Sequence, residues 1–327
     1  MHVRACAMRS KRTFLVTATV IALLIPGTFA AGARGQSKID NQGMVLDVRV
    51  VRDIAYRELQ PGEDAKRGKN KLDLFLPTER KQYPVILFVH GGAWVHGDKQ
   101  RTLYRNLALS WARKGIGTVM VNYRLSPGVK HPEHVKDVAT AFAWTYRHIA
   151  EYGGRPEQIF VCGHSAGGHL VSLLATDETY LKAEGLSQQS VRGVISICGV
   201  YRVHDLIAHA GMLQAEETKD AKSLEARLTP IAAIFGGDLE VRRQASPISH
   251  VHPGLPPFLV LYAEHDLPRL AEMAKEFDSL LQKNKCDAST KEIKGRNHVS
   301  IIFRIPRDGD PGGAAIADFI AKHTSNN

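Results

Sequence analysis

Apolar runs alternate with amphipathic stretches along most of the 327-residue chain. Continuous apolar runs such as Val85 to Val89 and Ile116 to Asn122 are typical of strands that are covered on both faces of a sheet. The stretch 101–114 carries leucine and tryptophan at helical spacing, which predicts an amphipathic helix. Because strands and helices alternate, the sequence predicts an α/β fold with an open, mostly parallel central sheet and helices on both faces.

The first predicted strand differs from the others. Residues 45–56 alternate in polarity and predict an edge strand, and a Gly- and Lys-rich hairpin loop is expected at 60–70. The other elements follow from the same periodicities. Strands are expected at 72–76, 84–90, 116–122, 159–162, 191–198, 257–262 and 288–293, and helices at 101–114, 132–151, 169–175, 269–283 and 316–320.

One strand, turn and helix carry the strongest chemical signal. The apolar run 159–162 precedes the G-x-S-x-G motif of residues 163–167, and a helical run follows. This order forms the nucleophile elbow of α/β-hydrolases. A Cβ at Gly163 or Gly167 would collide with neighbouring backbone, and the helix directs its positive end toward an oxyanion beside the serine. Ser165 is therefore the predicted nucleophile.

A serine hydroxyl needs a base, and the base needs an orienting acid. In the α/β-hydrolase order, the acid and then the histidine follow the nucleophile at the ends of later strands. Asp266 follows the strand expected at 257–262, and His298 follows the strand expected at 288–293. Asp266 is the predicted acid and His298 the predicted base. Glu264 is the alternative acid, which could instead support the loop by hydrogen bonding.

The oxyanion hole needs backbone N–H groups. One is expected from Ala166, directly after the nucleophile. The others are expected from the loop that begins at His90 with the sequence HGGAW, where glycines allow a close approach to the acyl oxygen. Gly92 and Ala93 are the predicted donors, and His90 is expected to brace the loop. Trp94 either walls the substrate pocket or belongs to the core, and both interpretations stay open.

Other polar residues have structural explanations. Close histidine pairs could suggest a metal site, but no H-E-x-x-H motif and no acidic cluster accompany them, so the sequence predicts no metal. These pairs are His131 with His134 and His204 with His209. His164 is expected to point away from the pocket, and His169 is expected to pack under the sheet. The residues expected to brace loops are Asp98, Tyr123, Ser126 and Asp137.

A long insertion separates two of the predicted strands. The stretch 199–256 exceeds a plain connection, and 205–213 and 221–228 are candidate helices. We interpret it as a small helical cap over the active-site mouth, and a surface excursion without substrate contact is the alternative. Charged residues interrupt its apolar ones, whereas a lipase lid needs a broad apolar face. The sequence therefore favours short acyl groups, from acetyl to about butyryl.

The N-terminus has the pattern of a targeting segment. Four basic residues precede the apolar run 14–25, and Pro26 interrupts the run before small residues. Cleavage is expected after Ala30 or Ala33, and an uncleaved membrane anchor is the alternative. The predicted segments are a signal peptide at 1–33, a flexible lead-in at 34–44 and a catalytic domain at 45–323. The protein is then secreted or periplasmic, without stable membrane insertion after cleavage.

Composition and charge do not indicate a polyanionic partner. The chain carries 43 basic and 33 acidic residues, a net charge of +10, and loss of the four basic residues of the leader lowers it to +6. The remaining basic residues are scattered, so the sequence predicts no nucleic-acid binding. Four cysteines without close spacing give no disulfide framework, although Cys162 and Cys198 could pair across adjacent strands. The oligomeric state stays open.

The motifs together resemble the esterase and lipase branch of the α/β-hydrolases that carries an H-G-G motif. The similarity covers about residues 45–323. It rests on HGG-x-W from His90, YRLSP from Tyr123, GHSAGG from Gly163, and then Asp266 and His298 in order. Ala93 stands where hormone-sensitive-lipase-like esterases usually have a third glycine. The chain is more similar to bacterial carboxylesterases of the bifunctional feruloyl and acetylxylan esterase type, and to kynurenine formamidases.

This resemblance implies a serine hydrolase that cleaves short-chain carboxylic esters through an acyl-enzyme, without a cofactor. The expected partner is a small-molecule or carbohydrate ester, with carbohydrate acetyl or feruloyl esters as the natural candidates. A formamidase or small-amide hydrolase would use the same residues and is one alternative. A non-catalytic binding module on a hydrolase fold is another, although such a module would normally lack part of the triad.

Overall fold

The computed structural model describes residues 46–203 and 232–324, which all belong to one compact unit. The expected signal peptide and lead-in, and the candidate helices at 205–213 and 221–228, lie outside these described residues. Where the structure is described, no helix is long and apolar enough to cross a membrane.

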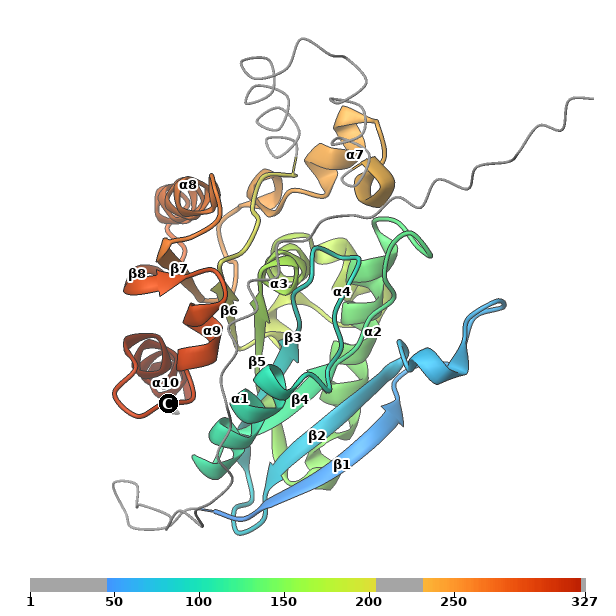
Figure 1. Cartoon of the computed structure of the whole chain (residues 1–327), viewed down its shortest axis with the longest axis vertical. Coiled ribbons are helices and arrows are strands. Elements are labelled where there is room, and N and C mark those ends of the chain that lie inside the picture. Colours follow the sequence, from blue (N-terminus) through green and yellow to red (C-terminus); the bar gives the residue numbers. More distant parts are fainter. Residues whose placement is uncertain (1–45, 204–231, 325–327) are drawn as a thin grey trace, which may run out of the picture. The chain divides into compact units, whose positions relative to one another are not determined.

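An eight-stranded sheet forms the centre of the unit (Figure 1). Its strands are β1 (Val48–Ala55), β2 (Lys71–Pro77), β3 (Tyr83–Val89), β4 (Gly117–Val121), β5 (Gly154–His164), β6 (Gly193–Ile197), β7 (Phe258–His265) and β8 (Ala288–Asn297). They lie in the order β1-β2-β4-β3-β5-β6-β7-β8. The first strand is antiparallel to the second and the second to β4, while β3 to β8 are mutually parallel. The predicted α/β fold with an N-terminal edge strand is confirmed.

Helices cover both faces of this sheet (Figure 1). On one face lie α2 (Glu133–His148), α3 (Ala166–Thr176) and α8 (Leu270–Lys283), and on the other α1 (Thr102–Arg113), α9 (Ser300–Arg304) and α10 (Pro311–Thr324). Successive side chains of a strand point to opposite faces. In β3, Val85 and Leu87 therefore lie in the hydrophobic core on the face of α2, α3 and α8, which we call the first core. Ile86 and Phe88 lie in the second core, on the face of α1, α9 and α10. This double burial explains why β3 reads as an unbroken apolar run.

Several features differ from the sequence-based expectation. Strand β5 begins at Gly154, five residues before the expected start at 159, and β7 ends at His265, three residues beyond 262. The last strand, β8, extends to Asn297, four residues beyond the expected end at 293. Short helices at α4 (Glu178–Ala183) and α9 were not predicted, because six and five residues are too few to show a helical period. The lengthening of β8 matters for function, since it determines where the residue after the strand lies.

The elbow between β5 and α3 is as crowded as its glycines suggest. Ser165 has φ 57° and ψ −119°, which is a strained conformation for a residue with a side chain. A Cβ on Gly163 would lie 2.2 Å from the carbonyl oxygen of Gly167. A Cβ on Gly167 would lie 2.0 Å from the carbonyl oxygen of Val89, at the end of β3. Only glycine fits at these two positions.

Part of the predicted cap is described, namely residues 199–203 and 232–256. Its return limb, which we define as residues 232–245, includes α7 (Leu239–Gln244). Ile234 and Phe235 are buried in the core, and Ile234 O accepts a hydrogen bond of 2.8 Å from the N–H of His131. The return limb is therefore packed onto the domain beside the carboxyl ends of the strands.

We expect Gly167→Ala to lower the free energy of unfolding by roughly 1–3 kcal/mol or more, because the new Cβ would overlap the main chain of β3. Gly237→Ala is the matched control, since a Cβ there meets no atom within 4 Å. Urea unfolding followed by circular dichroism measures both variants. Equal stability of the two would show that the elbow is not closely packed against β3.

Candidate active site

Strands β7 and β8 bring the predicted acid and base together. Their register pairs His265 with Asn297, so the residues that follow them, Asp266 and His298, leave the sheet side by side. His298 Nδ1 donates a hydrogen bond of 2.6 Å to Asp266 Oδ1. Because Nδ1 carries the proton in this pair, Nε2 is the nitrogen that can accept a proton.

Asp266 is held as a carboxylate. Its side chain is only 1% exposed. Burial opposes ionisation, but hydrogen bonds from His298, from the Cys198 thiol and from the N–H of Leu267 outweigh it, and the pKa of Asp266 lies below its ordinary value. The N–H groups of Leu267 and Ala263 lie 2.8 and 3.2 Å from its two oxygens. Such an anion can orient an imidazole and stabilise its charged form.

The alternative acid, Glu264, has other partners. It accepts hydrogen bonds from the N–H of Gly295 at 2.7 Å and from Lys294 Nζ at 3.3 Å. Within the described chain, no hydrogen bond joins it to His298. Glu264 therefore ties the end of β7 to β8 and leaves the contact with His298 to Asp266.

The predicted nucleophile lies at the same edge of the sheet. The N–H of Ser165 donates to Ile197 O at 2.9 Å, and its carbonyl accepts from the N–H of His169 at 3.0 Å. Its hydroxyl makes no hydrogen bond with any residue that the structure describes. Bonds between nucleophile and base are often long until substrate is bound. The structure thus places Ser165 after β5 and Asp266 and His298 after β7 and β8, at the same edge of the sheet, with the hydrogen bond between Asp266 and His298 already formed.

The HGGAW loop passes directly over the elbow. A Cβ on Gly91 would lie 2.8 Å from His164 O and 3.1 Å from the Cβ of Ser165. Gly92 and Ala93 have φ values of 127° and 51°, in the left-handed region. In the described part of the chain, the N–H groups of Gly92, Ala93 and Ala166 have no acceptor. Free N–H groups beside the serine are what an oxyanion hole requires.

His90 and two tyrosines hold the start of this loop. The His90 ring stacks on Tyr123 with centroids 4.5 Å apart, and Tyr123 Oη donates to His90 O at 3.1 Å. Tyr104 Oη accepts a hydrogen bond of 3.2 Å from the N–H of Gly91. Burial lowers the pKa of His90 to about 4, so its ring is neutral at neutral pH. His90 is a structural brace and not a second base.

Trp94 is enclosed by the protein. Its side chain lies in the first core and is 5% exposed, and its indole N–H donates to His169 Nδ1 at 3.2 Å. Little of its surface is left for a substrate to contact. A substrate-binding role for Trp94 stays a prediction, while its contacts within the core are plain.

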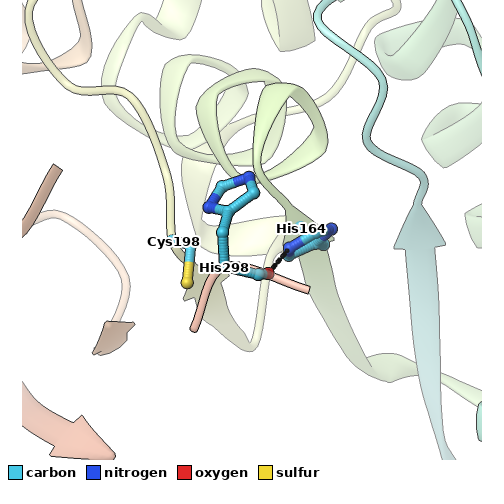
Figure 2. Close-up of side chains that lie close together, drawn as sticks. All are labelled: His164, Cys198 and His298. Carbon is cyan, nitrogen blue, oxygen red and sulfur yellow. Dashed lines mark hydrogen bonds between the residues drawn. The ribbon is translucent and has the colours of Figure 1, made fainter. Parts of the chain in front are cut away.

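From the sequence, His164 is expected only to point away from the pocket, with no partner named. Its side chain is buried, and Nε2 donates a hydrogen bond of 2.8 Å to the carbonyl oxygen of His298 (Figure 2). Burial lowers the pKa of His164 to about 3, so this ring is a neutral donor. The residue before the nucleophile therefore holds the main chain of the predicted base. No sequence pattern links two positions that are 134 residues apart.

Among the described residues, one group of potential metal ligands comes together, and it overlaps the triad. Nitrogen and sulfur atoms of His164, Cys198 and His298 lie within 4.8 Å of one another. Figure 2 shows the His298 imidazole and the Cys198 thiol pointing in opposite directions. Burial, with the Asp266 carboxylate nearby, raises the pKa of the thiol well above its ordinary value, whereas metals bind the thiolate. These residues do not fit a metal centre.

The remaining residues singled out in the sequence brace loops or pack in the core. Asp98 accepts from Lys69 and Asn122, Ser126 donates to Val129 O, and Asp137 accepts from Arg57 and Arg124. His134 contacts Ser126, and His204 and His209 lie outside the described residues. Cys162, Cys198 and Cys286 are free thiols, so the bridge between the first two is not formed.

The sequence matches known proteins over most of its length. The model of the family BD-FAE matches residues 72–280. Esterase LipC from Mycobacterium tuberculosis is 33% identical over 248 residues, which are 75% of this chain and 59% of LipC. The probable carboxylic ester hydrolase LipM of the same organism is 32% identical over 86% of this chain and 64% of LipM. The chain thus spans less than two thirds of either relative.

Solved structures share the fold. Esterase B from Lactobacillus rhamnosis has a TM-score of 0.68 at 21% identity. The matched region covers 86% of this chain and 87% of the esterase B chain. A truncated carbohydrate esterase from gut microbiota has a TM-score of 0.66 at 18% identity, with 86% and 98% covered. At such low identity the likeness concerns the fold, and it confirms the predicted α/β-hydrolase architecture.

Buried histidines should make folding sensitive to acid. Burial lowers the pKa of His134 to about 4. The unfolded chain binds this proton below about pH 6.5, so between pH 6.5 and 4 the unfolded state holds more protons and stability falls as pH falls, by about 1.4 kcal/mol per pH unit. His134→Asn should remove the contribution of His134 to the dependence of the free energy of unfolding on pH, measured by urea unfolding between pH 7 and 4.5. His265→Asn, at a side chain 73% exposed, is the control and should leave the slope unchanged. Identical slopes in wild type and His134→Asn would contradict the assignment.

Proposed function

We propose that this chain, which belongs to the BD-FAE family, hydrolyses short-chain carboxylic esters through an acyl-enzyme on Ser165. One observation carries this proposal. A strained serine at the elbow, a bonded Asp266–His298 pair and a loop with free N–H groups all lie at the carboxyl ends of parallel strands, β5, β7, β8 and β3, of one sheet. The names of the relatives LipC and LipM, an esterase and a probable carboxylic ester hydrolase, agree with it.

In the proposed reaction, Ser165 Oγ attacks the ester carbonyl carbon while its proton passes to His298 Nε2. The tetrahedral intermediate collapses, the C–O bond to the alcohol breaks, and His298 returns the proton to the leaving oxygen. Water then attacks the acyl-enzyme with the same proton transfers and releases the acid. Asp266 holds the imidazole by its Nδ1–H and stabilises the imidazolium form.

The oxyanion would be bound by main-chain groups. The N–H of Ala166 begins α3, so it combines a free donor with the positive end of a helix. The N–H groups of Gly92 and Ala93, in the HGGAW loop, would complete the hole. Loss of one such donor reduces kcat by about 100- to 1000-fold in serine hydrolases. These groups need no metal or cofactor for the chemistry described here.

For natural substrates we propose carbohydrate acetyl or feruloyl esters. Residues 1–33 have the pattern of an export signal, and an exported or periplasmic enzyme meets polysaccharide esters. The charged insertion at 199–256 argues for small acyl groups over fatty chains. The carbohydrate esterase among the structural neighbours shares the fold, but at 18% identity it does not identify the substrate of this chain.

The two candidate acids can be separated by substitution. We expect Asp266→Asn to lower kcat on p-nitrophenyl acetate by about 10,000-fold, because the imidazole loses the anion that orients it. Glu264→Gln should change kcat only a few-fold, since its oxygens contact Gly295 and Lys294. Steady-state kinetics on both variants decides the question, and the reverse ranking would make Glu264 the acid.

The acyl preference is tested with p-nitrophenyl esters from acetate to palmitate, with the Ser165→Ala variant as the blank. We expect a maximum between acetate and butyrate, and at least a 1000-fold loss in the blank, as roughly four to six decades separate triad mutants from wild type. A maximum at octanoate or longer, or activation at an oil–water interface, would refute the short-chain preference. Faster turnover of N-formyl amides than of the esters would favour a formamidase instead.

A further inference from the structure

The loop that supplies the proposed oxyanion donors is strained. Ala93 and Trp94, which follow one another, have φ values of 51° and 59°. For residues with a Cβ this conformation costs roughly 1–2 kcal/mol each, and it persists only where the surroundings enforce it. Two main-chain hydrogen bonds help to hold this conformation. They run from the N–H of His96 to Gly92 O and from the N–H of Ser126 to Trp94 O, both at 2.9 Å. The side chain of Trp94 provides a third attachment.

That attachment runs through His169. Because an indole N–H can only donate, His169 Nδ1 must accept the 3.2 Å bond from Trp94 Nε1. The ring proton then sits on Nε2, which donates to Ala245 O at 2.7 Å. Burial lowers the pKa of His169 to about 3, so the neutral form that this arrangement needs is the one present at neutral pH. Both ring nitrogens are thus used.

His169 is also part of the elbow. It lies in the first turn of α3, and its main-chain N–H donates to Ser165 O at 3.0 Å. One residue therefore bonds the main chain of the nucleophile, the indole of the oxyanion loop and the main chain of Ala245, at the end of the return limb. These three segments are far apart in sequence, and in the described part of the chain the hydrogen bonds of His169 connect them.

The return limb also contacts Trp94 and His169, through the ring of Phe235. The Phe235 ring packs edge-on against Trp94, with centroids 4.9 Å apart and an interplanar angle of 83°. It packs in the same way against His169, at 5.7 Å and 78°. Phe235 is 2% exposed, so the contact excludes water from the Trp94–His169 bond. A bond in such an apolar setting is stronger than at the surface.

We propose that His169 is a positioning residue for the oxyanion hole. It holds the strained loop against the elbow through Trp94, and through Ala245 it makes the position of this loop depend on the return limb of the insertion. The inference rests on the proposed function, because it assigns a role in a reaction that has been proposed. A purely structural His169 would affect stability alone, whereas a positioning residue also affects how well the folded enzyme stabilises the oxyanion.

The test compares four variants of the full chain. Trp94→Phe removes the donor and keeps a ring, and His169→Phe removes both ring nitrogens. His169→Gln keeps an acceptor and a donor on one amide. Trp111→Phe is the matched control, since Trp111 is 4% exposed, packs on Phe88 and lies in α1 on the other face of the sheet.

Four measurements are made on each variant. They are the thermal midpoint, kcat and KM on p-nitrophenyl acetate, the rate of inactivation by paraoxon, and the indole N–H signals in the NMR spectrum. Paraoxon places a phosphoryl oxygen where the oxyanion forms, so its rate reports on the hole independently of ester turnover. The protein has three tryptophans, and Trp94→Phe assigns the relevant indole signal.

We expect Trp94→Phe and His169→Phe to lower kcat and the paraoxon rate by about 10- to 100-fold with KM nearly unchanged, the pattern of a loss confined to the transition state. His169→Gln should recover most of this loss. His169→Phe should shift the Trp94 indole signal, and Trp111→Phe should lower the thermal midpoint without changing the rates.

Unchanged rates in folded Trp94→Phe, or a His169→Gln variant no better than His169→Phe, would overturn the inference. A failure of the proposed function looks different. In that case the wild type does not turn over p-nitrophenyl acetate. If it still reacts with paraoxon, the ratio of paraoxon rates between wild type and variants decides whether His169 positions the loop; if it reacts with neither compound, Ser165 is not an activated nucleophile and it is the proposed function that fails.

Discussion

The close approach between the elbow and the end of β3 is the constraint on which the active site depends. Gly167 fits against Val89 O only because it lacks a Cβ, and Gly91 fits against His164 O for the same reason. These two contacts set the serine and the HGGAW loop at a fixed separation. Strain at Ser165, Ala93 and neighbouring residues is therefore carried by a packed sheet with a core on each face.

The contact between Asp266 and His298 depends on a different feature, an irregularity in the pairing of β7 with β8. Ala263 pairs with Ile293, but His265 pairs with Asn297, so β8 holds two extra residues. Bulges of this kind redirect the strand and commonly lie beside active sites. Glu264 accepts the N–H of Gly295 within it. The carboxylate that does not meet the imidazole thus secures the backbone geometry that brings Asp266 and His298 together.

Neutral histidines connect these parts. His90, His164 and His169 are buried, and burial lowers the pKa of each to about 4 or 3, so they act as uncharged hydrogen-bonding groups. Each neutral imidazole bonds a main-chain carbonyl without burying a charge: His90 bonds Gly91 O, His164 bonds His298 O and His169 bonds Ala245 O. The cost is lower stability in acid, because the unfolded chain takes up the protons that the folded chain excludes.

The sequence by itself determined the alternation of strands and helices, the elbow at Ser165 and the place of the HGGAW loop, because periodicity, glycine spacing and motif order are local properties. It also ordered the candidate acid and base along the chain. Which of Asp266 and Glu264 contacts His298, the partners of His164 and His169, and the enclosure of Trp94 were decided only by the tertiary structure. Trp94 and His169 are 75 residues apart, and His164 and His298 are 134 apart. Such contacts depend on strand order, register and a bulge, and these arise when the whole sheet packs against its helices.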